Sequence, residues 1–146
     1  MHLLAASGAA LIDTGAILAI VDAKDYWHSR CVEALQSVRI PLLTTEAVLT
    51  EAFHLTGSNP YNVERIWRFV RSGALTACSM GDSDLPELHA LMTQYADRPM
   101  DFADATLVHL AALESLTTIL TIDHDDFETY RLPGRKKFTI LPRRQS

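Results

Sequence analysis

The chain has 146 residues, of which 48% are hydrophobic and 21% are charged. This length and composition predict one globular domain over residues 1–146 and exclude a collagen-like, disordered or disulfide-rich protein. Its two cysteines lie outside any CxxC pattern, and no apolar run approaches the roughly 20 residues of a membrane span. We therefore expect a cytoplasmic protein without membrane contact, with a short N-terminal tail over residues 1–8.

The formal net charge of −5 is unevenly distributed along the chain. Six of the 13 basic residues and no acidic residue lie within 131–146, which leaves seven basic against 18 acidic residues before them, a formal charge of −11. A basic end on an acidic body is typical of phosphate binding beside a carboxylate-rich site, and equally of a solvated tail. We place the basic C-terminal tail at residues 142–146.

Taken in chain order, short apolar runs alternate with helical patterns. Strands are predicted at 9–13, 40–44, 75–79, 117–122 and 137–141. Helices are predicted at 16–23, 27–38, 46–56, 63–71, 84–95, 102–114 and 123–130, with Thr45 as an N-cap, Gly57 as a helix end and a loop at 58–60. Alternating strands and helices indicate an α/β protein, a three-layer α/β/α sandwich with a mainly parallel five-stranded sheet.

Two aspartates come directly after predicted strands. Asp13 ends the segment ALID, and Asp123 follows TTILTI. Each can cap the helix that comes next. Because open α/β sheets bind ligands beyond the carboxyl ends of their strands, each also lies where a functional site is expected. Thr14 would add a hydroxyl to the same pocket, or serve only in the turn.

Two further acids lie on helix faces that the pattern assigns to the core. Glu51 falls on the apolar stripe formed by Val48, Ala52 and Leu55, and Asp104 begins the stripe that continues at 107, 108 and 111. An unpaired buried carboxylate costs several kcal/mol. These acids are therefore expected to be protonated, paired with an arginine, located at an exposed edge of the stripe, or bound to a cation.

A parallel sheet can bring all four acids to one edge. Asp101, three residues before Asp104, either caps the helix with it or joins the cluster. Clustered carboxylates repel one another unless a proton or a divalent cation intervenes, and ligation by oxygen alone favours Mg²⁺ or Mn²⁺ over Zn²⁺. No HxxxH pair, P-loop, GxGxxG or GxSxG motif is present in the sequence.

These features resemble a PIN domain, and within that family the VapC-type toxins of bacterial toxin–antitoxin pairs. The resemblance rests on four stretches in the family's order, LIDTGAILAIVD at 11–22, LTTEAVLTEAFHL at 43–55, MDFADATLVHLA at 100–111 and TILTIDHDDFETYR at 118–131. It implies a metal-dependent ribonuclease with a five-stranded parallel sheet between helices, often a homodimer. Its cofactor would be Mg²⁺ or Mn²⁺ and its substrate RNA.

The resemblance also implies the roles of individual residues. The family's acidic positions map onto Asp13, Glu51, Asp104 and Asp123 as catalytic and metal-binding residues, with Asp101 as a further metal ligand. Asp125 and Asp126 are alternatives to Asp123 as the ligand of the last cluster. Candidates for contact with RNA are Thr14, Arg131, Arg135, Lys136 and Lys137.

A partner follows from the same resemblance. VapC-type toxins are held by a small antitoxin protein, and its segment would occupy a groove between the helices at 27–38 and 63–71. The aromatic side chains of Tyr26, Trp27 and Trp67 either stack on RNA bases or pack between helices.

Two other classes of protein share parts of this pattern. A catalytically inactive PIN-like module would bind RNA or protein without turnover, but it has no need of four acids. A receiver-type phosphoryl-transfer domain also clusters acids at strand ends. It needs a lysine after a late strand, whereas Lys24 lies early and Lys136 and Lys137 precede the last predicted strand.

Overall fold

A parallel sheet forms the centre of the protein, whose computed structural model describes residues 8–144. Five strands lie in the order β3-β2-β1-β4-β7, and every neighbouring pair is parallel. They are β1 (Ala9–Ile12), β2 (Arg39–Thr45), β3 (Leu75–Cys78), β4 (Thr118–Leu120) and β7 (Thr139–Leu141). The predicted five-stranded parallel sheet is confirmed.

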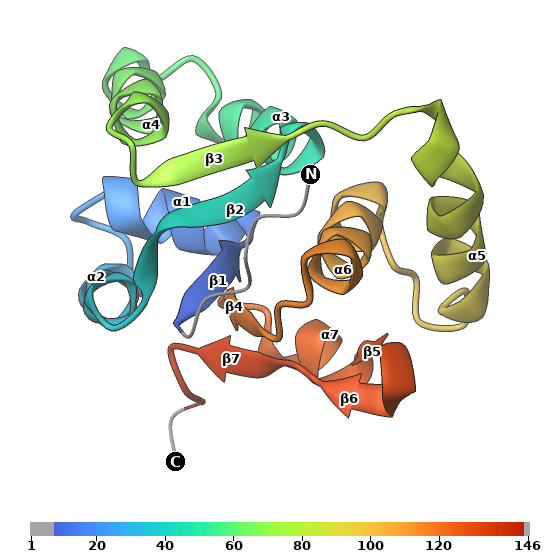
Figure 1. Cartoon of the computed structure of the whole chain (residues 1–146). Helices are drawn as coiled ribbons and strands as arrows, with labels where there is room; N and C mark the ends of the chain where they lie inside the picture. The colour runs from blue at the N-terminus through green and yellow to red at the C-terminus, as the bar shows by residue number, and fades with distance from the viewer. Residues whose placement is uncertain (1–7, 145–146) are drawn as a thin grey trace.

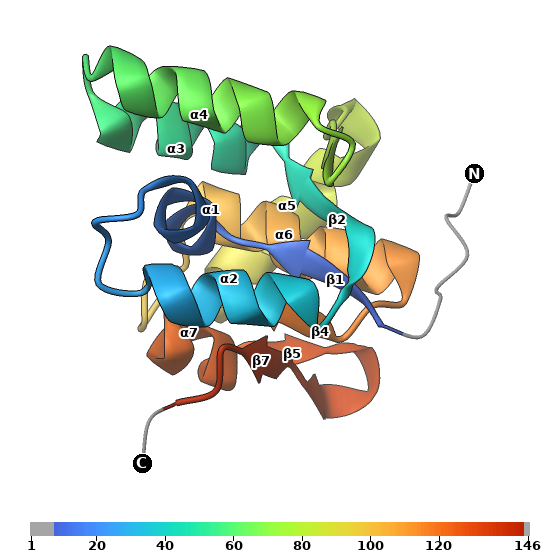
Figure 2. The ribbon, with the colours of Figure 1, turned by 90° about the vertical axis from the view of Figure 1, so that its left-hand side faces the viewer.

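Helices cover both faces of this sheet and complete the predicted α/β/α sandwich (Figures 1 and 2). One layer contains α1 (Thr14–Val21), α2 (His28–Gln36) and α4 (Pro60–Arg71), and the other contains α5 (Leu85–Gln94) and α6 (Phe102–Glu114). Helix α3 (Glu46–Thr56) contacts both α1 and α6, and α7 (His124–Thr129) packs against β7.

The core lies on both sides of the two central strands. Leu11 and Ile12 of β1 and Ile119 and Leu120 of β4 are completely buried. Helix α6 is enclosed on all sides, because every residue from 103 to 111 is buried. The carboxylate of Asp104, in the first turn of α6, is therefore buried as well.

Local capping fixes where the helices next to the site begin. The Thr45 hydroxyl accepts a hydrogen bond from the Val48 amide at 3.3 Å, which confirms Thr45 as the N-cap of α3. Gly57 ends that helix with φ of 60°, as predicted. Asp101 caps α6 by accepting from the Asp104 amide at 2.7 Å.

Several element boundaries differ from the predicted ones: helix α1 begins at Thr14 and not at 16, and two further differences have a clear local cause. Helix α4 begins at Pro60 and not at Val63, because the Asn59 side chain caps it by accepting from the amides of Tyr61 and Asn62. The last strand of the sheet begins at 139 and not at 137, because residues 136–137 form a short strand, β6, antiparallel to β5 at 131–132. Gly134, with φ of 74°, reverses the chain between these two strands.

The chain ends fall partly outside the described residues. Of the predicted N-terminal tail at 1–8, only Gly8 is described, and its carbonyl accepts from the Arg39 amide at 2.7 Å. Within the predicted basic tail at 142–146, Pro142 is buried and its carbonyl accepts from His124 Nε2 at 2.8 Å. Between residues 8 and 144, no helix has the length and apolar character to cross a membrane.

Candidate active site

The sheet order defines where a site is expected. Strand β1 connects onward to β2 on one side and pairs with β4 on the other, so the strand order reverses between β1 and β4. In open α/β sheets, ligands bind in the crevice beyond the carboxyl ends of the strands at such a point. Asp13 directly follows β1, and its amide donates to the Leu120 carbonyl of β4 at 2.9 Å.

Asp13 is held firmly at this edge. One carboxylate oxygen accepts from the Thr14 amide at 2.7 Å and the other from the Thr121 hydroxyl at 3.0 Å. Burial raises the pKa of Asp13 to about 6, although both hydrogen bonds lower it, and the charges of Glu51 and Asp123 raise it further. Three of the predicted site acids therefore act on one another at this edge.

Asp104 reaches the same cluster from α6. Its side chain is buried, and its Oδ2 accepts a hydrogen bond from the Tyr130 hydroxyl at 2.7 Å. Burial raises the pKa of Asp104 to about 8, and the charge of Asp13 is the next largest cause. The two most buried site carboxylates, from β1 and α6, thus come together as the sequence pattern predicted.

The other predicted acids lie nearer the surface of the cluster. Glu51 on α3 is half-buried, and burial followed by the charge of Asp101 raises its pKa. Leu55 is 58% exposed, so the predicted buried stripe of α3 does not extend to it and Glu51 lies at the edge of the buried face. Asp123 lies three residues beyond β4 and caps α7, and burial raises its pKa, with Asp126 as its main neighbour.

These carboxylates are not neutralised by basic side chains. In the described part of the chain, no lysine or arginine forms an ion pair with Asp13, Glu51, Asp104 or Asp123. Oxygen-only donors with raised pKa values fit a hard divalent cation, whose positive charge would stabilise their ionised forms. Across residues 8–144, however, no three potential ligand side chains converge on one point, so the acids form an electrostatic cluster and not a closed ligand cage.

The predicted RNA-contact residues differ in where they lie: Thr14 adjoins the acids through its amide, which donates to Asp13, whereas the basic residues make other contacts. Thr14 is 4% exposed, and its hydroxyl donates to the Val48 carbonyl at 3.4 Å. The Arg131 guanidinium donates to the carbonyls of Glu128, Thr129 and Tyr130 at the end of α7. These contacts leave the RNA-binding roles of both residues as predictions.

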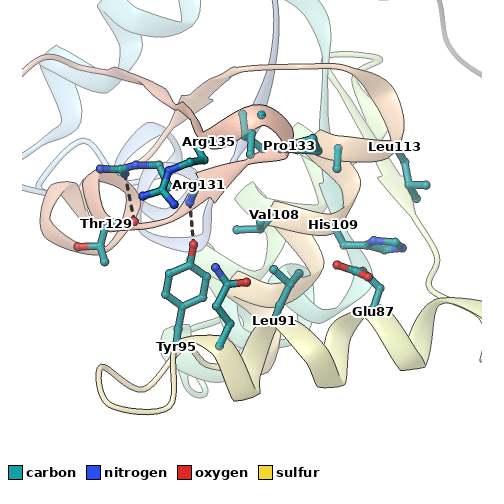
Figure 3. Close-up of a pocket in the computed structure, with 14 residues that line it drawn as sticks. Glu87, Leu91, Tyr95, Val108, His109, Leu113, Thr129, Arg131, Pro133 and Arg135 are labelled. Atoms are coloured by element: carbon teal, nitrogen blue, oxygen red, sulfur yellow. Dashed lines mark hydrogen bonds between the residues drawn. The ribbon is translucent and has the colours of Figure 1, made fainter.

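The basic hairpin faces a different part of the molecule. Arg131 and Arg135 line a cavity of about 840 Å³ between α5, α6 and the β5–β6 hairpin (Figure 3), and none of the predicted site acids lines it. Lys136 lines a smaller hollow together with Ser115, which follows the carboxyl end of α6. That end is separated from Asp104 by 11 residues of helix, about 16 Å. In the described residues, none of the side-chain hydrogen bonds or ion pairs of this hairpin joins its basic residues to the predicted site acids.

Sequence reasoning missed two residues that hold the acids in place. Thr121 donates to Asp13 and accepts from the Asp123 amide at 3.0 Å, so one hydroxyl joins two site acids. The sequence signal for this role is the position of Thr121, two residues before Asp123. Tyr130 is 1% exposed and contacts Asp104 from 26 residues away, and no local pattern indicates such a contact.

Comparisons with known proteins agree with this geometry, although no family profile matches the chain. The sequence is 30% identical over 135 residues to ribonuclease VapC26 of Mycobacterium tuberculosis (strain ATCC 25618 / H37Rv), covering 90% of this chain and 99% of that protein. The crystal structure of M. tuberculosis VapC20, a sarcin–ricin loop cleaving toxin, superposes with a TM-score of 0.70 at 16% identity, over 80% of this chain and 92% of that one.

A second solved structure has the same fold. VapBC2 from Rickettsia felis, bound to a DNA fragment from its promoter, matches with a TM-score of 0.64 at 14% identity, over 90% of this chain and 98% of that one. Both structures share the α/β/α sandwich with the present chain. Together with the sequence identity to VapC26, they show that the chain belongs to the PIN-domain family of VapC-type toxin ribonucleases.

Proposed function

We propose that this protein hydrolyses RNA phosphodiester bonds with the help of Mg²⁺ or Mn²⁺, as the toxin of a toxin–antitoxin pair. The observation that carries this proposal is that two buried acids, Asp13 and Asp104, lie within electrostatic reach of each other, and that within residues 8–144 neither forms an ion pair with a lysine or arginine. Such a pair is stable when protonated or when a cation lies beside it. The proposal is also supported by the similarity of this chain to VapC26, which is a ribonuclease.

Four acids would hold the ion: Asp13, Glu51, Asp104 and Asp123, with Asp101 at the edge of the set. A divalent ion at this place supplies Lewis-acid activation of water and compensates charge on the phosphodiester. The chain contributes preorganisation, because Thr121 fixes the Asp13 carboxylate and Tyr130 fixes that of Asp104. Binding of a cation would favour the ionised carboxylates and so release the proton that Asp104, with a pKa of about 8, holds at neutral pH.

We further propose an antitoxin partner and a homodimer, the first supported by the similarity to the VapBC2 assembly. Helix α1 packs against both α2 and α4, the two helices between which the antitoxin segment is expected to bind (Figure 2). Of the aromatic residues nearby, Trp27 packs on the His124 ring at 5.7 Å and Trp67 on Phe53 at 5.0 Å, whereas Tyr26 is 81% exposed. Tyr26 thus remains the better candidate for stacking on a base.

Cleavage of RNA by the purified protein tests the proposal. Wild type should cut RNA in Mg²⁺ or Mn²⁺ and lose this activity in EDTA, and Asp13→Asn should lower the rate by about 10²-fold or more. Asp125→Asn is the matched control, because Asp125 is an exposed α7 acid paired with Arg144 at 2.7 Å. Undiminished cleavage in EDTA would refute a metal-dependent mechanism, and RNA binding without cleavage would indicate an inactive binding module.

A further inference from the structure

Arg98 lies at the rim of the acid cluster and is not among the predicted site residues. Arg98 belongs to the segment between α5 and α6, and its side chain is 49% exposed. Its Nε lies 3.5 Å from Oδ1 of Asp126 on α7. The sequence pattern indicated only a break in the chain at Arg98 and Pro99.

The backbone around Arg98 is fixed by its neighbours. The Arg98 amide donates to the Tyr95 carbonyl at 3.1 Å, which closes a turn directly after α5. Pro99 restricts the next φ angle, and Met100 is 3% exposed and anchors the segment in the core. Asp101 then caps α6. Arg98 is therefore carried on a defined turn, three residues before a predicted metal ligand.

Asp126 connects Arg98 with the rim of the acid cluster. The Asp126 amide donates to Oδ1 of Asp123 at 3.3 Å. The charge of Asp126 also acts on Asp104, where it is one of the causes of the raised pKa. A positive group beside Asp126 thus lies at the edge of the cluster formed by Asp104 and Asp123.

Other arginines near α7 are held by stronger contacts. Arg131 donates to three backbone carbonyls, and Arg144 pairs with Asp125 at 2.7 Å and with Glu128 at 3.1 Å. Within residues 8–144, the contact to Asp126 is the one ion pair that Arg98 forms, and at 3.5 Å it is longer than a hydrogen bond. Exposed ion pairs contribute little to stability, so Arg98 can exchange Asp126 for another anion at small cost.

We propose that Arg98 is a substrate-binding residue whose guanidinium binds an RNA phosphate beside the scissile bond, leaving Asp126 when RNA enters. The planar guanidinium presents paired N–H donors that match two phosphate oxygens. An RNA backbone that approaches an acidic cluster is repelled, and a cation at the rim offsets part of that repulsion. Such a contact adds affinity without reading the base sequence. This inference rests on the proposed ribonuclease function.

Binding of a fluorescently labelled single-stranded RNA oligonucleotide, measured at several salt concentrations in Mg²⁺, tests the inference. The background is Asp104→Asn, which should bind RNA without cutting it. Arg98→Ala in this background should weaken binding about 5- to 10-fold and reduce the slope of log K against log salt by about 0.7, the value for one phosphate contact on a single strand. The RNA affinity of Arg98→Lys in this background should lie between that of the Asp104→Asn background and that of Arg98→Ala.

Arg144→Ala is the matched control, since it removes the same charge from a residue bound to α7. It should change RNA affinity less than 2-fold and leave the salt slope unchanged. Equal effects of Arg98→Ala and Arg144→Ala, or an unchanged salt slope in Arg98→Ala, would overturn the proposal. Thermal unfolding of Arg98→Ala and of Arg98→Gln distinguishes loss of RNA binding from loss of a structural contact with α7. Loss of that contact alone would lower Tm without altering the salt slope. Cleavage by the Asp104→Asn background, or its failure to bind RNA, would instead count against the proposed function.

Discussion

Replacing the buried carboxyl group of Asp104 with an amide should stabilise this protein at high pH. Asp104 is 7% exposed and its pKa is about 8, against an ordinary value of 3.8. Without a divalent cation, this acid is ionised in the unfolded chain throughout pH 5 to 8, whereas in the folded chain it stays mostly protonated until the pH approaches 8. The free energy of unfolding must therefore fall as the pH rises.

The size of this loss follows from the same values. Each pH unit between the unfolded and folded pKa of Asp104 removes about 1.4 kcal/mol, so up to about 4 kcal/mol is lost between pH 5 and pH 8. Asp104→Asn lacks this loss, because the amide resembles the protonated acid and its oxygen still accepts from Tyr130. The variant should therefore gain on wild type steadily over this interval and be the more stable protein at pH 8. Asp13, with a pKa of about 6, adds a loss at lower pH that both proteins share.

Urea unfolding in EDTA at pH 5, 6, 7 and 8 measures this difference directly. Titration of groups that do not interact with Asp104 cancels when the variant is compared with wild type at each pH. Saturating Mn²⁺ should stabilise wild type at pH 8 and remove most of the advantage of the variant. A difference between the two proteins that does not change with pH would show that Asp104 ionises normally in the folded chain and would refute the reasoning.

Three further substitutions test the packing around the site. Gly15→Ala should lower the free energy of unfolding by about 1–3 kcal/mol, because the new methyl group would lie 2.7 Å from a side-chain carbon of Ile122, and Ile122→Ala should restore much of the loss when the two are combined. Thr121→Val should lower the rate of RNA cleavage about 10- to 100-fold, since it removes the hydroxyl that orients Asp13. Tyr130→Phe should weaken Mn²⁺ binding by about 10-fold and lower the free energy of unfolding by about 1–2 kcal/mol.

Each of these substitutions has a measurement that can contradict it. Urea unfolding of the single and double Gly15 variants should show coupling, and additive effects would mean that the helix moves to accommodate the methyl group. Cleavage by Thr121→Val at the wild-type rate would show that Asp13 is held without the hydroxyl. Calorimetric titration of Tyr130→Phe with Mn²⁺ that gives the wild-type Kd would exclude a positioning role for Tyr130.

Much of the site could be predicted because its acids contradict their local pattern. A carboxylate that ends a buried strand or begins an apolar helix is costly, and this made Asp13 and Asp104 conspicuous. The order of strands and helices was likewise evident from alternating periods. The two-residue strands at 131–132 and 136–137 were missed because they are too short to show any period.

Tertiary contacts account for what the sequence did not indicate. Leu55 follows the helical stripe of α3 but is 58% exposed, because burial depends on where the neighbouring elements end. Tyr130 and Arg98 reach the acid cluster through contacts over 26 and 28 positions, and neither stands out from its local sequence. The charge of the C-terminal segment predicts phosphate binding beside the acids; Lys136 lines a hollow with residues near the carboxyl end of α6, and its role in RNA binding stays a prediction.

Titration of the metal-free protein with Mn²⁺, followed by electron paramagnetic resonance of the free ion, tests the central claim most directly. We expect wild type to bind Mn²⁺ at the acid cluster. Asp13→Asn and Asp104→Asn should each weaken this binding by about 10²-fold or more, whereas Asp125→Asn should bind Mn²⁺ as wild type does. Equal Mn²⁺ binding by wild type and Asp104→Asn, or none by either, would contradict it.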